Sequence, residues 1–296
     1  MKKFYLLLMA AVIGIAQMAA QRSATVVQDS IQSKILGTSR NYSVILPPGY
    51  KENPEQTYPV LYLLHGLYGT NKSWVEEGQL RDEADRMMKD WSAVPMIIVS
   101  PDAGGKDADK LQNGYFNLPG WRYEDFFFEE FMPEIEKKYR IKGDKNHRAI
   151  AGLSMGGGGT VVYAQKHPEK FCAAYPMSAW LCLNETQKKQ RENGKEKSNI
   201  SEKMWLLGES VDKNDCLEFV KNATPEQKDE MRSIRWYIDC GDDDFLLDDN
   251  LKFYQALRDA QIPAQLRVRD GAHKWYYWRQ ALSTCLPFAS AAFTQK

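Results

Sequence analysis

The chain has 296 residues, 43% of them hydrophobic and 26% charged, so it can bury a sizeable core and is neither a disordered nor a fibrous protein. Lysine and arginine together number 39, as do aspartate and glutamate. Without a basic excess the chain has no large positive field for phosphate backbones, and nucleic acid is excluded as the expected partner.

The N-terminal segment has the pattern of an export signal. Two lysines are followed by an apolar run over residues 4–16, and Ala19 and Ala20 stand before polar Gln21. The run is too short to span a bilayer comfortably. We expect a signal peptide over residues 1–20 rather than a buried first helix. The mature chain is then a soluble periplasmic or extracellular protein without membrane contact.

Seven short apolar runs predict the strands of a sheet. Several carry apolar residues on both faces, as strands buried between two helical layers do. They are residues 42–46, 59–66, 95–101, 147–152, 171–179, 234–241 and 264–271. Residues 31–50 are expected to form an antiparallel hairpin at the sheet edge, stopped by Pro47 and Pro48.

Helix-like segments lie between these runs. Apolar residues share one helical face at Leu80, Ala84, Met87, Met88 and Trp91, and at Phe128, Phe131, Ile135 and Tyr139. Alternating strands and helices predict a doubly wound, mostly parallel sheet of the α/β class. Residues 21–296 then form one domain. Residues 184–203, with six basic and four acidic residues, fall in an expected insertion over residues 183–232, either a cap or a solvated surface excursion.

The cysteine and histidine spacings indicate no metal site or cofactor. The five cysteines have no CxxC pair, and their odd number leaves at least one unpaired or paired with another chain; Cys182 and Cys216 could bridge. The four histidines show no HxxxH spacing. The sequence does not indicate an oligomeric state.

A serine between glycines predicts a catalytic nucleophile. In "GLSMGG", Ser154 follows the apolar run 147–152 and opens a helix-like segment, where a nucleophile elbow lies. Gly152 and Gly156 leave room for a serine held at strained backbone angles. The alternative, an ordinary serine in a glycine-rich loop, explains the glycines but not their place at the end of a buried strand.

A serine nucleophile needs a base and an acid. His273 follows the last predicted strand and comes after a run of acids, which gives the chain order Ser, Asp, His. In "IDCGDDDFLLDD", Asp239 is still within the strand, and Asp248 and Asp249 resemble helix N-caps. The residues alone leave Asp242, Asp243 and Asp244 open as the acid.

The oxyanion of an acyl-transfer transition state needs two backbone N–H donors. Met155 follows the nucleophile at the start of its helix and is the expected first donor. Leu67 is the expected second donor, in a loop where Gly66 and Gly69 permit close backbone approach. His65, in the same loop, is then a structural residue.

Four ordered motifs carry a family resemblance: "YLLHGLYG", "GLSMGG", "CGDDD" and "GAHKWYYW". Together they resemble the putative-esterase branch of the α/β-hydrolases, which includes feruloyl and acetylxylan esterases, S-formylglutathione hydrolases and mycolyltransferases. The resemblance implies the α/β-hydrolase fold and Leu67 and Met155 as oxyanion donors. It implies Asp244 as the acid, three residues after the glycine of a G-x-x-D turn, with Asp243 as the alternative.

The substrate class follows mainly from this resemblance. Trp275 and Tyr276 closely follow His273, and Trp121 and Trp180 fall in predicted loops, so these four aromatic residues are expected to line a pocket for a planar acyl group or a sugar. The alternative is that they pack the last helix and the loops. We expect an exported serine esterase that removes feruloyl or acetyl groups from plant polysaccharide. The alternatives are a broad short-chain acyl esterase and an inactive carbohydrate-binding protein.

Overall fold

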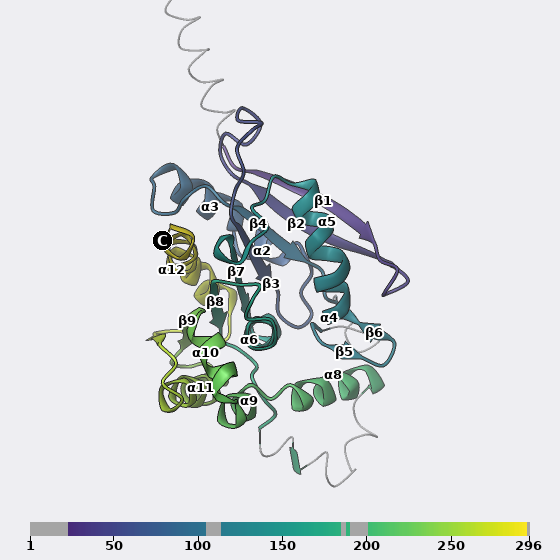
Figure 1. Cartoon of the computed structure of the whole chain (residues 1–296), viewed down its shortest axis with the longest axis vertical. Helices are drawn as coiled ribbons and strands as arrows, with labels where there is room; N and C mark the ends of the chain where they lie inside the picture. The colour runs from purple at the N-terminus through teal and green to yellow at the C-terminus, as the bar shows by residue number, and fades with distance from the viewer. Residues whose placement is uncertain (1–22, 105–113, 185–187, 190–200, 295–296) are drawn as a thin grey trace, which may run out of the picture.

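The computed structural model describes residues 23–104, 114–184, 188–189 and 201–294; the expected signal peptide lies outside them. An eight-stranded sheet with the order β1-β2-β4-β3-β7-β8-β9-β10 dominates the structure (Figure 1). Its strands are β1 (Thr25–Gln32), β2 (Ser39–Leu46), β3 (Val60–Leu64), β4 (Ile97–Pro101), β7 (Arg148–Leu153), β8 (Ala173–Met177), β9 (Arg235–Gly241) and β10 (Ala264–Arg269). Two further short strands, β5 (Asn117–Leu118) and β6 (Trp121–Arg122), pair with each other.

The sheet is parallel from β4 to β10, which confirms the predicted fold class. All seven predicted strands are present. Strands β3, β4 and β8 are buried along their whole length. Because helices cover both faces of the sheet, these strands need apolar side chains on both sides, and their sequences are continuous apolar runs for that reason.

The edge hairpin is confirmed, with one strand displaced from the prediction. β1 pairs antiparallel with β2, and β2 pairs antiparallel with β4. The predicted hairpin began at residue 31, but its first strand runs over Thr25–Gln32 and residues 33–38 form the turn. β1 is an edge strand with no fully buried residue, so its sequence carries little of the apolar signal that marks the other strands.

Helices form a layer on each face of the sheet. α3 (Leu80–Lys89) and α12 (Trp275–Thr294) pack together on one face, whereas α6 (Met155–Lys166) packs on the other (Figure 1). The other helical segments are α2 (Ser73–Glu76), α4 (Tyr123–Asp125), a π-helix (Phe126–Phe131), α5 (Met132–Lys138), a 3₁₀-helix (Lys145–His147), α8 (Glu202–Lys213), α9 (Cys216–Asn222), α10 (Pro225–Arg232) and α11 (Leu247–Asp259). In the described part of the chain, no helix is long and apolar enough to cross a bilayer.

Trp91 does not belong to the buried face on which the sequence placed it. Helix α3 ends at Lys89, and Trp91 has φ +65° with 78% of its surface exposed. A residue in this left-handed conformation just after a helix turns the chain away from the helix axis, so the helical periodicity no longer applies to its side chain.

The expected insertion over residues 183–232 contributes three helices in its described part. α9 packs against α6 and α11, and Leu207, Val211 and Val220 are buried in the main hydrophobic cluster. Most of the charged stretch 184–203 lies outside the described residues. The possible bridge between Cys182 and Cys216 is absent, because both are free, buried thiols, as are the other three cysteines.

Candidate active site

Ser154 occupies a strained turn between β7 and α6. Its φ of +54° and ψ of −117° are unusual for a residue with a side chain. Gly152 and Gly156 make the turn possible, because a Cβ atom at Gly152 would lie 2.4 Å from the Gly156 carbonyl oxygen and one at Gly156 would lie 2.5 Å from the His65 oxygen. The Ser154 N–H donates to the Met177 carbonyl at 2.9 Å, which ties the turn to β8.

The chain brings His273 and Asp244 to this serine. The Nε2 atom of His273 lies 2.9 Å from Ser154 Oγ, and its Nδ1 atom lies 2.9 Å from Asp244 Oδ2 and 3.1 Å from Oδ1. The three residues follow β7, β9 and β10, and the carboxyl ends of parallel strands meet at one edge of the sheet. Side chains far apart in sequence therefore form one continuous chain of hydrogen bonds.

The Asp244 carboxylate is held in an ionised form. Its side chain is fully buried, which opposes ionisation, but hydrogen bonds from His273, the Leu246 N–H and Ser178 outweigh burial and lower its pKa below the usual value. Asp244 is the member of the acidic run that contacts His273. Asp248 and Asp249 lie in the first turn of α11, so the N-cap position expected for them belongs to Leu246.

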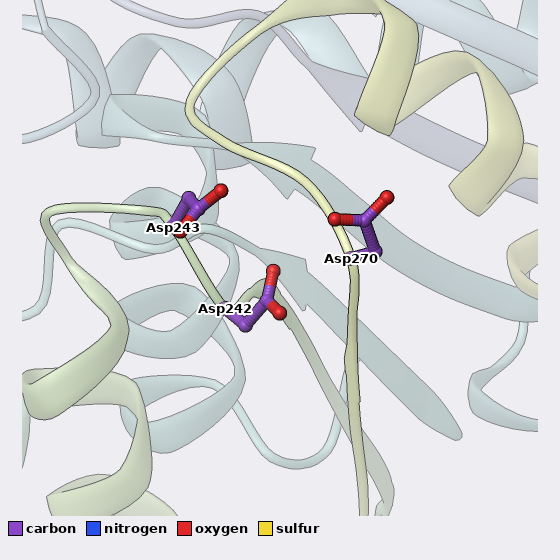
Figure 2. A group of neighbouring side chains, drawn as sticks. All are labelled: Asp242, Asp243 and Asp270. Carbon is purple, nitrogen blue, oxygen red and sulfur yellow. The ribbon is translucent and has the colours of Figure 1, made fainter.

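Asp242, Asp243 and Asp270 form an exposed acidic cluster beside the loop that carries His273 (Figure 2). The Oδ1 atom of Asp242 accepts a hydrogen bond from the Gly271 N–H, and the Asp243 N–H donates to the Gly271 carbonyl, both at 2.9 Å. These bonds join the loops that follow β9 and β10. Asp243, the alternative to Asp244, therefore lies in the loop contact rather than against the imidazole.

The other three histidines have separate partners. His65 is completely buried, its Nδ1 lies 2.8 Å from the Gly66 carbonyl, and its Nε2 accepts from the Ala103 N–H at 3.0 Å. His147 pairs with Asp144, and His167 lies 3.3 Å from Glu124. Only His273 has a ring nitrogen on Ser154.

A cavity of about 400 Å³ opens in front of Ser154. Leu67 and Trp275, both singled out in the sequence, are in its wall. Met155 is the first residue of α6, where helix N–H groups lack an intrahelical acceptor. The lining residues are Gly66, Leu67, Tyr68, Gly69, Ser73, Glu77, Leu153, Ser154, Phe245, His273, Trp275 and Trp278.

Three of the four predicted aromatic residues are not among the residues that line this cavity. Trp121 is buried, its indole N–H donates to the Gly114 carbonyl, and its ring stacks on Tyr123. Trp180 packs against the main hydrophobic cluster, and its backbone N–H donates to the Ser154 carbonyl at 3.0 Å. The Tyr276 hydroxyl accepts from the Ala272 N–H and so supports the His273 loop. Trp121 and Tyr276 thus serve local packing and a loop hydrogen bond, and substrate contact by these three residues stays a prediction.

Sequence reasoning missed three aromatic side chains of the pocket. Phe245 is 77% exposed with its ring 4.6 Å from that of His273, Tyr68 is 49% exposed, and Trp278 meets the His273 ring edge-on at 4.9 Å. Their positions gave a signal, since Phe245 directly follows the acid, Tyr68 follows Leu67, and Trp278 lies one helical turn after Trp275.

Comparison with known proteins identifies the family. The family profile described as "Putative esterase" matches residues 33–289. A solved ferulic acid esterase is 49% identical and superimposes with a TM-score of 0.85 over 92% of this chain and 99% of its own. A solved serine hydrolase of Staphylococcus aureus, named FphF and substrate-bound, is 25% identical with a TM-score of 0.72, over 90% of this chain and 99% of its own.

Curated relatives match over different spans. An endo-1,4-beta-xylanase/feruloyl esterase of Xylanibacter ruminicola is 33% identical over 147 residues, which are 49% of this chain and 20% of that protein. An acetyl esterase of Caldicellulosiruptor saccharolyticus is 22% identical over 90% of this chain and 98% of its own length. The chain thus spans only a fifth of the first of these relatives. With the matched profile covering residues 33–289, the chain belongs to the putative-esterase family of carboxylic ester hydrolases with the α/β-hydrolase fold.

Proposed function

We propose that this protein is an exported serine carboxylic ester hydrolase with Ser154 as nucleophile, His273 as general base and Asp244 as the acid that orients the base. The observation that carries the proposal is the hydrogen-bond chain with 2.9 Å between Ser154 Oγ and His273 Nε2 and 2.9 Å between His273 Nδ1 and Asp244. A serine hydroxyl becomes an effective nucleophile when a positioned imidazole takes its proton.

The reaction proceeds through an acyl-enzyme. Ser154 Oγ attacks the ester carbonyl while its proton passes to His273, and the carbonyl oxygen becomes negative in front of the Leu67 and Met155 N–H groups. The intermediate then collapses, and the leaving alcohol takes the proton from His273. A water molecule, deprotonated by the same imidazole, attacks the acyl-enzyme and releases the acid and free Ser154.

The proposed substrates are feruloyl or acetyl esters of plant cell-wall polysaccharide. Tyr68, Phe245 and Trp275 give the pocket aromatic walls, which favour a planar, aromatic acyl group over acetyl. The names of the relatives, a ferulic acid esterase and a xylanase/feruloyl esterase, point the same way. No cofactor takes part in this mechanism. The second candidate, a broad short-chain acyl esterase, has the same triad and differs in acyl preference.

The decisive experiment is turnover by the protein and by Ser154→Ala on methyl ferulate, acetylated xylan, p-nitrophenyl acetate and p-nitrophenyl butyrate. Ser154-dependent kcat/KM for ferulate or xylan acetate well above the p-nitrophenyl esters supports a polysaccharide esterase. Activity confined to the p-nitrophenyl esters favours the broad acyl esterase. No turnover, together with no labelling of Ser154 by a fluorophosphonate, contradicts the enzyme and favours the carbohydrate-binding protein.

The proposal includes export of the chain and a single catalytic domain. Residues 1–20 supply the signal pattern and residues 21–296 one catalytic domain, with residues 183–232 as an insertion. No residue of that insertion, in its described part, lines the pocket at Ser154. Mass spectrometry of the secreted chain should find an N-terminus near Gln21; a secreted chain that keeps residues 1–20 contradicts the signal peptide.

A further inference from the structure

Asp239 is a buried carboxylate that the triad does not use. It lies in β9, is completely buried, and accepts a hydrogen bond from a tyrosine on each of its oxygens. Oδ2 accepts from the Tyr175 hydroxyl on β8 and Oδ1 from the Tyr277 hydroxyl on α12, each at 2.5 Å. A buried carboxylate is costly unless it is paired and hydrogen-bonded, so these bonds hold the groups around it in place. Asp239 thus joins two strands to the first turn of α12.

Arg269 supplies the opposite charge. It is the last residue of β10, and its Nε lies 3.8 Å from Asp239 Oδ1. Its guanidinium also lies 4.2 Å from the centre of the Tyr277 ring, which is the geometry of a cation–π contact. Nη2 donates to the Tyr277 carbonyl at 3.2 Å, and Nη1 donates to Gln280 Oε1 at 2.9 Å. The last residue of β10 is therefore fixed to the beginning of α12.

The loop between β10 and α12 carries His273, and Tyr277 contacts this loop on both sides of the histidine. Before the histidine, the Tyr277 ring packs so closely on Gly271 that a Cβ atom there would lie 2.4 Å from Cδ2 of the ring. After the histidine, the Tyr277 N–H donates to the Lys274 carbonyl at 3.0 Å. A displacement of Tyr277 therefore moves the backbone of the loop and, with it, the imidazole.

We propose that Asp239, Arg269 and Tyr277 form a buried clasp that positions the His273 imidazole against Ser154. The clasp joins the two ends of the His273 loop, because it binds the last residue of β10 to the first turn of α12. None of its three residues is among those that line the cavity at Ser154, so they are positioning residues that act through His273. This proposal rests on the catalytic triad of the proposed function. A misplacement of about 1 Å in a catalytic group can cost about a hundredfold in rate, which sets the size of the expected effect.

The test compares Tyr277→Phe with Tyr175→Phe, with p-nitrophenyl acetate as substrate. Each substitution keeps the ring and removes one hydroxyl from the same carboxylate, so urea unfolding should show similar losses of stability in the two variants. Of the two tyrosines, only Tyr277 contacts the His273 loop. We expect kcat to fall about tenfold to a hundredfold in Tyr277→Phe and less than about threefold in Tyr175→Phe, while KM changes less than about twofold in both.

A spectroscopic measurement separates positioning from stability. The low-field proton resonance of the His273–Asp244 hydrogen bond should shift in Tyr277→Phe and stay in place in Tyr175→Phe. Equal losses of kcat in the two variants overturn the proposal, as does a Tyr277→Phe variant that loses stability but neither kcat nor the position of the resonance. Turnover that persists in Ser154→Ala contradicts the proposed function and the clasp with it. Ser154-dependent turnover that Tyr277→Phe leaves intact contradicts the clasp alone.

Arg269→Lys provides an independent measurement, with Arg267→Lys as its matched control. Both arginines lie on β10 and bond to α12, but Arg267 bonds to Thr284, farther along the helix from the His273 loop. Lysine keeps the positive charge near Asp239 but lacks the planar fork that contacts the Tyr277 ring and carbonyl together. We expect kcat to fall about threefold to tenfold for Arg269→Lys and less than about twofold for Arg267→Lys. Equal effects of the two substitutions contradict the clasp, and this pair decides the question if Tyr277→Phe does not fold.

Discussion

Two histidines stand at the carboxyl edge of the sheet on opposite sides of Ser154, one in the loop after β3 and one in the loop after β10. His65 has both ring nitrogens on backbone groups, the Gly66 carbonyl and the Ala103 N–H. His273 has both on side chains, Asp244 and Ser154. A histidine in a glycine-containing loop is structural when backbone groups contact both of its ring nitrogens. It can take part in proton transfer when side chains contact them instead.

Burial reinforces this difference. His65 is completely buried, and loss of hydration lowers its pKa, although Asp102 at 3.9 Å partly opposes the effect. A neutral imidazole with Nδ1–H donating and Nε2 accepting therefore acts as a fixed bridge between two loops. His273, with 19% of its side chain exposed, faces the cavity in which an ester can reach it.

The largest expected effect on turnover comes from removing His273 or its partner Ser154. Ser154→Ala and His273→Ala should each lower kcat by about 10⁴-fold or more, since either change removes the nucleophile or the base. Neither side chain is part of the hydrophobic core, so thermal unfolding should stay within a few degrees of the unchanged protein. Measurement of kcat on p-nitrophenyl acetate beside a thermal melt checks both statements; a variant that keeps a tenth of the activity contradicts the assigned role.

The acid gives the next largest effect. Asp244→Asn should reduce kcat by about 10⁴-fold or somewhat less, because an amide cannot hold His273 in the tautomer that accepts the Ser154 proton. Asp243→Asn is the matched control, since Asp243 is exposed and only its backbone N–H joins the loop at Gly271. We expect it to change kcat less than about threefold. Equal losses in the two variants would falsify Asp244 as the acid.

The structural histidine should respond mainly in stability. His65→Phe keeps a ring of similar size but leaves the Ala103 N–H unpaired, which should lower the free energy of unfolding by about 1–3 kcal/mol. His65→Gln retains an acceptor for that N–H and should lose less. The loop also carries Leu67, so displacement of the loop can lower kcat. The fall should be no more than about a hundredfold, which is the loss expected when one oxyanion donor is removed. Urea unfolding and kcat for both variants check this; a loss as large as in His273→Ala would make His65 a catalytic residue.

The sequence was sufficient for features that depend on local pattern and chain order. Continuous apolar runs identified the buried strands, and the glycines around Ser154 identified the turn. The position of His273 after the last strand was enough to bring it to Ser154, because every parallel strand ends at the same edge of the sheet.

Features that depend on three-dimensional loop contacts could not be predicted. Asp242, Asp243 and Asp244 are chemically identical, and the contact of their turn with Gly271 decides which one faces His273. Trp121 is an aromatic residue of the type that lines binding pockets, but its indole N–H donates to the Gly114 carbonyl.

The smallest expected effect is a pH dependence of stability that belongs to His65. In the unfolded chain His65 takes up a proton near its ordinary pKa of 6.5, whereas in the folded chain burial lowers the pKa and delays protonation. Between those two values the unfolded state binds the extra proton, so the free energy of unfolding falls as the pH is lowered, by at most about 1.4 kcal/mol per pH unit. Above pH 6.5 His65 is neutral in both the folded and the unfolded state, so the free energy of unfolding carries no loss from this residue. The lowered pKa of Asp244 acts in a separate window, with stability lost below its ordinary value of 3.8. Urea unfolding at pH 7.5, 6.5 and 5.5 should therefore show a steeper decline for the unchanged protein than for His65→Gln, and parallel declines would place the pH dependence in other groups.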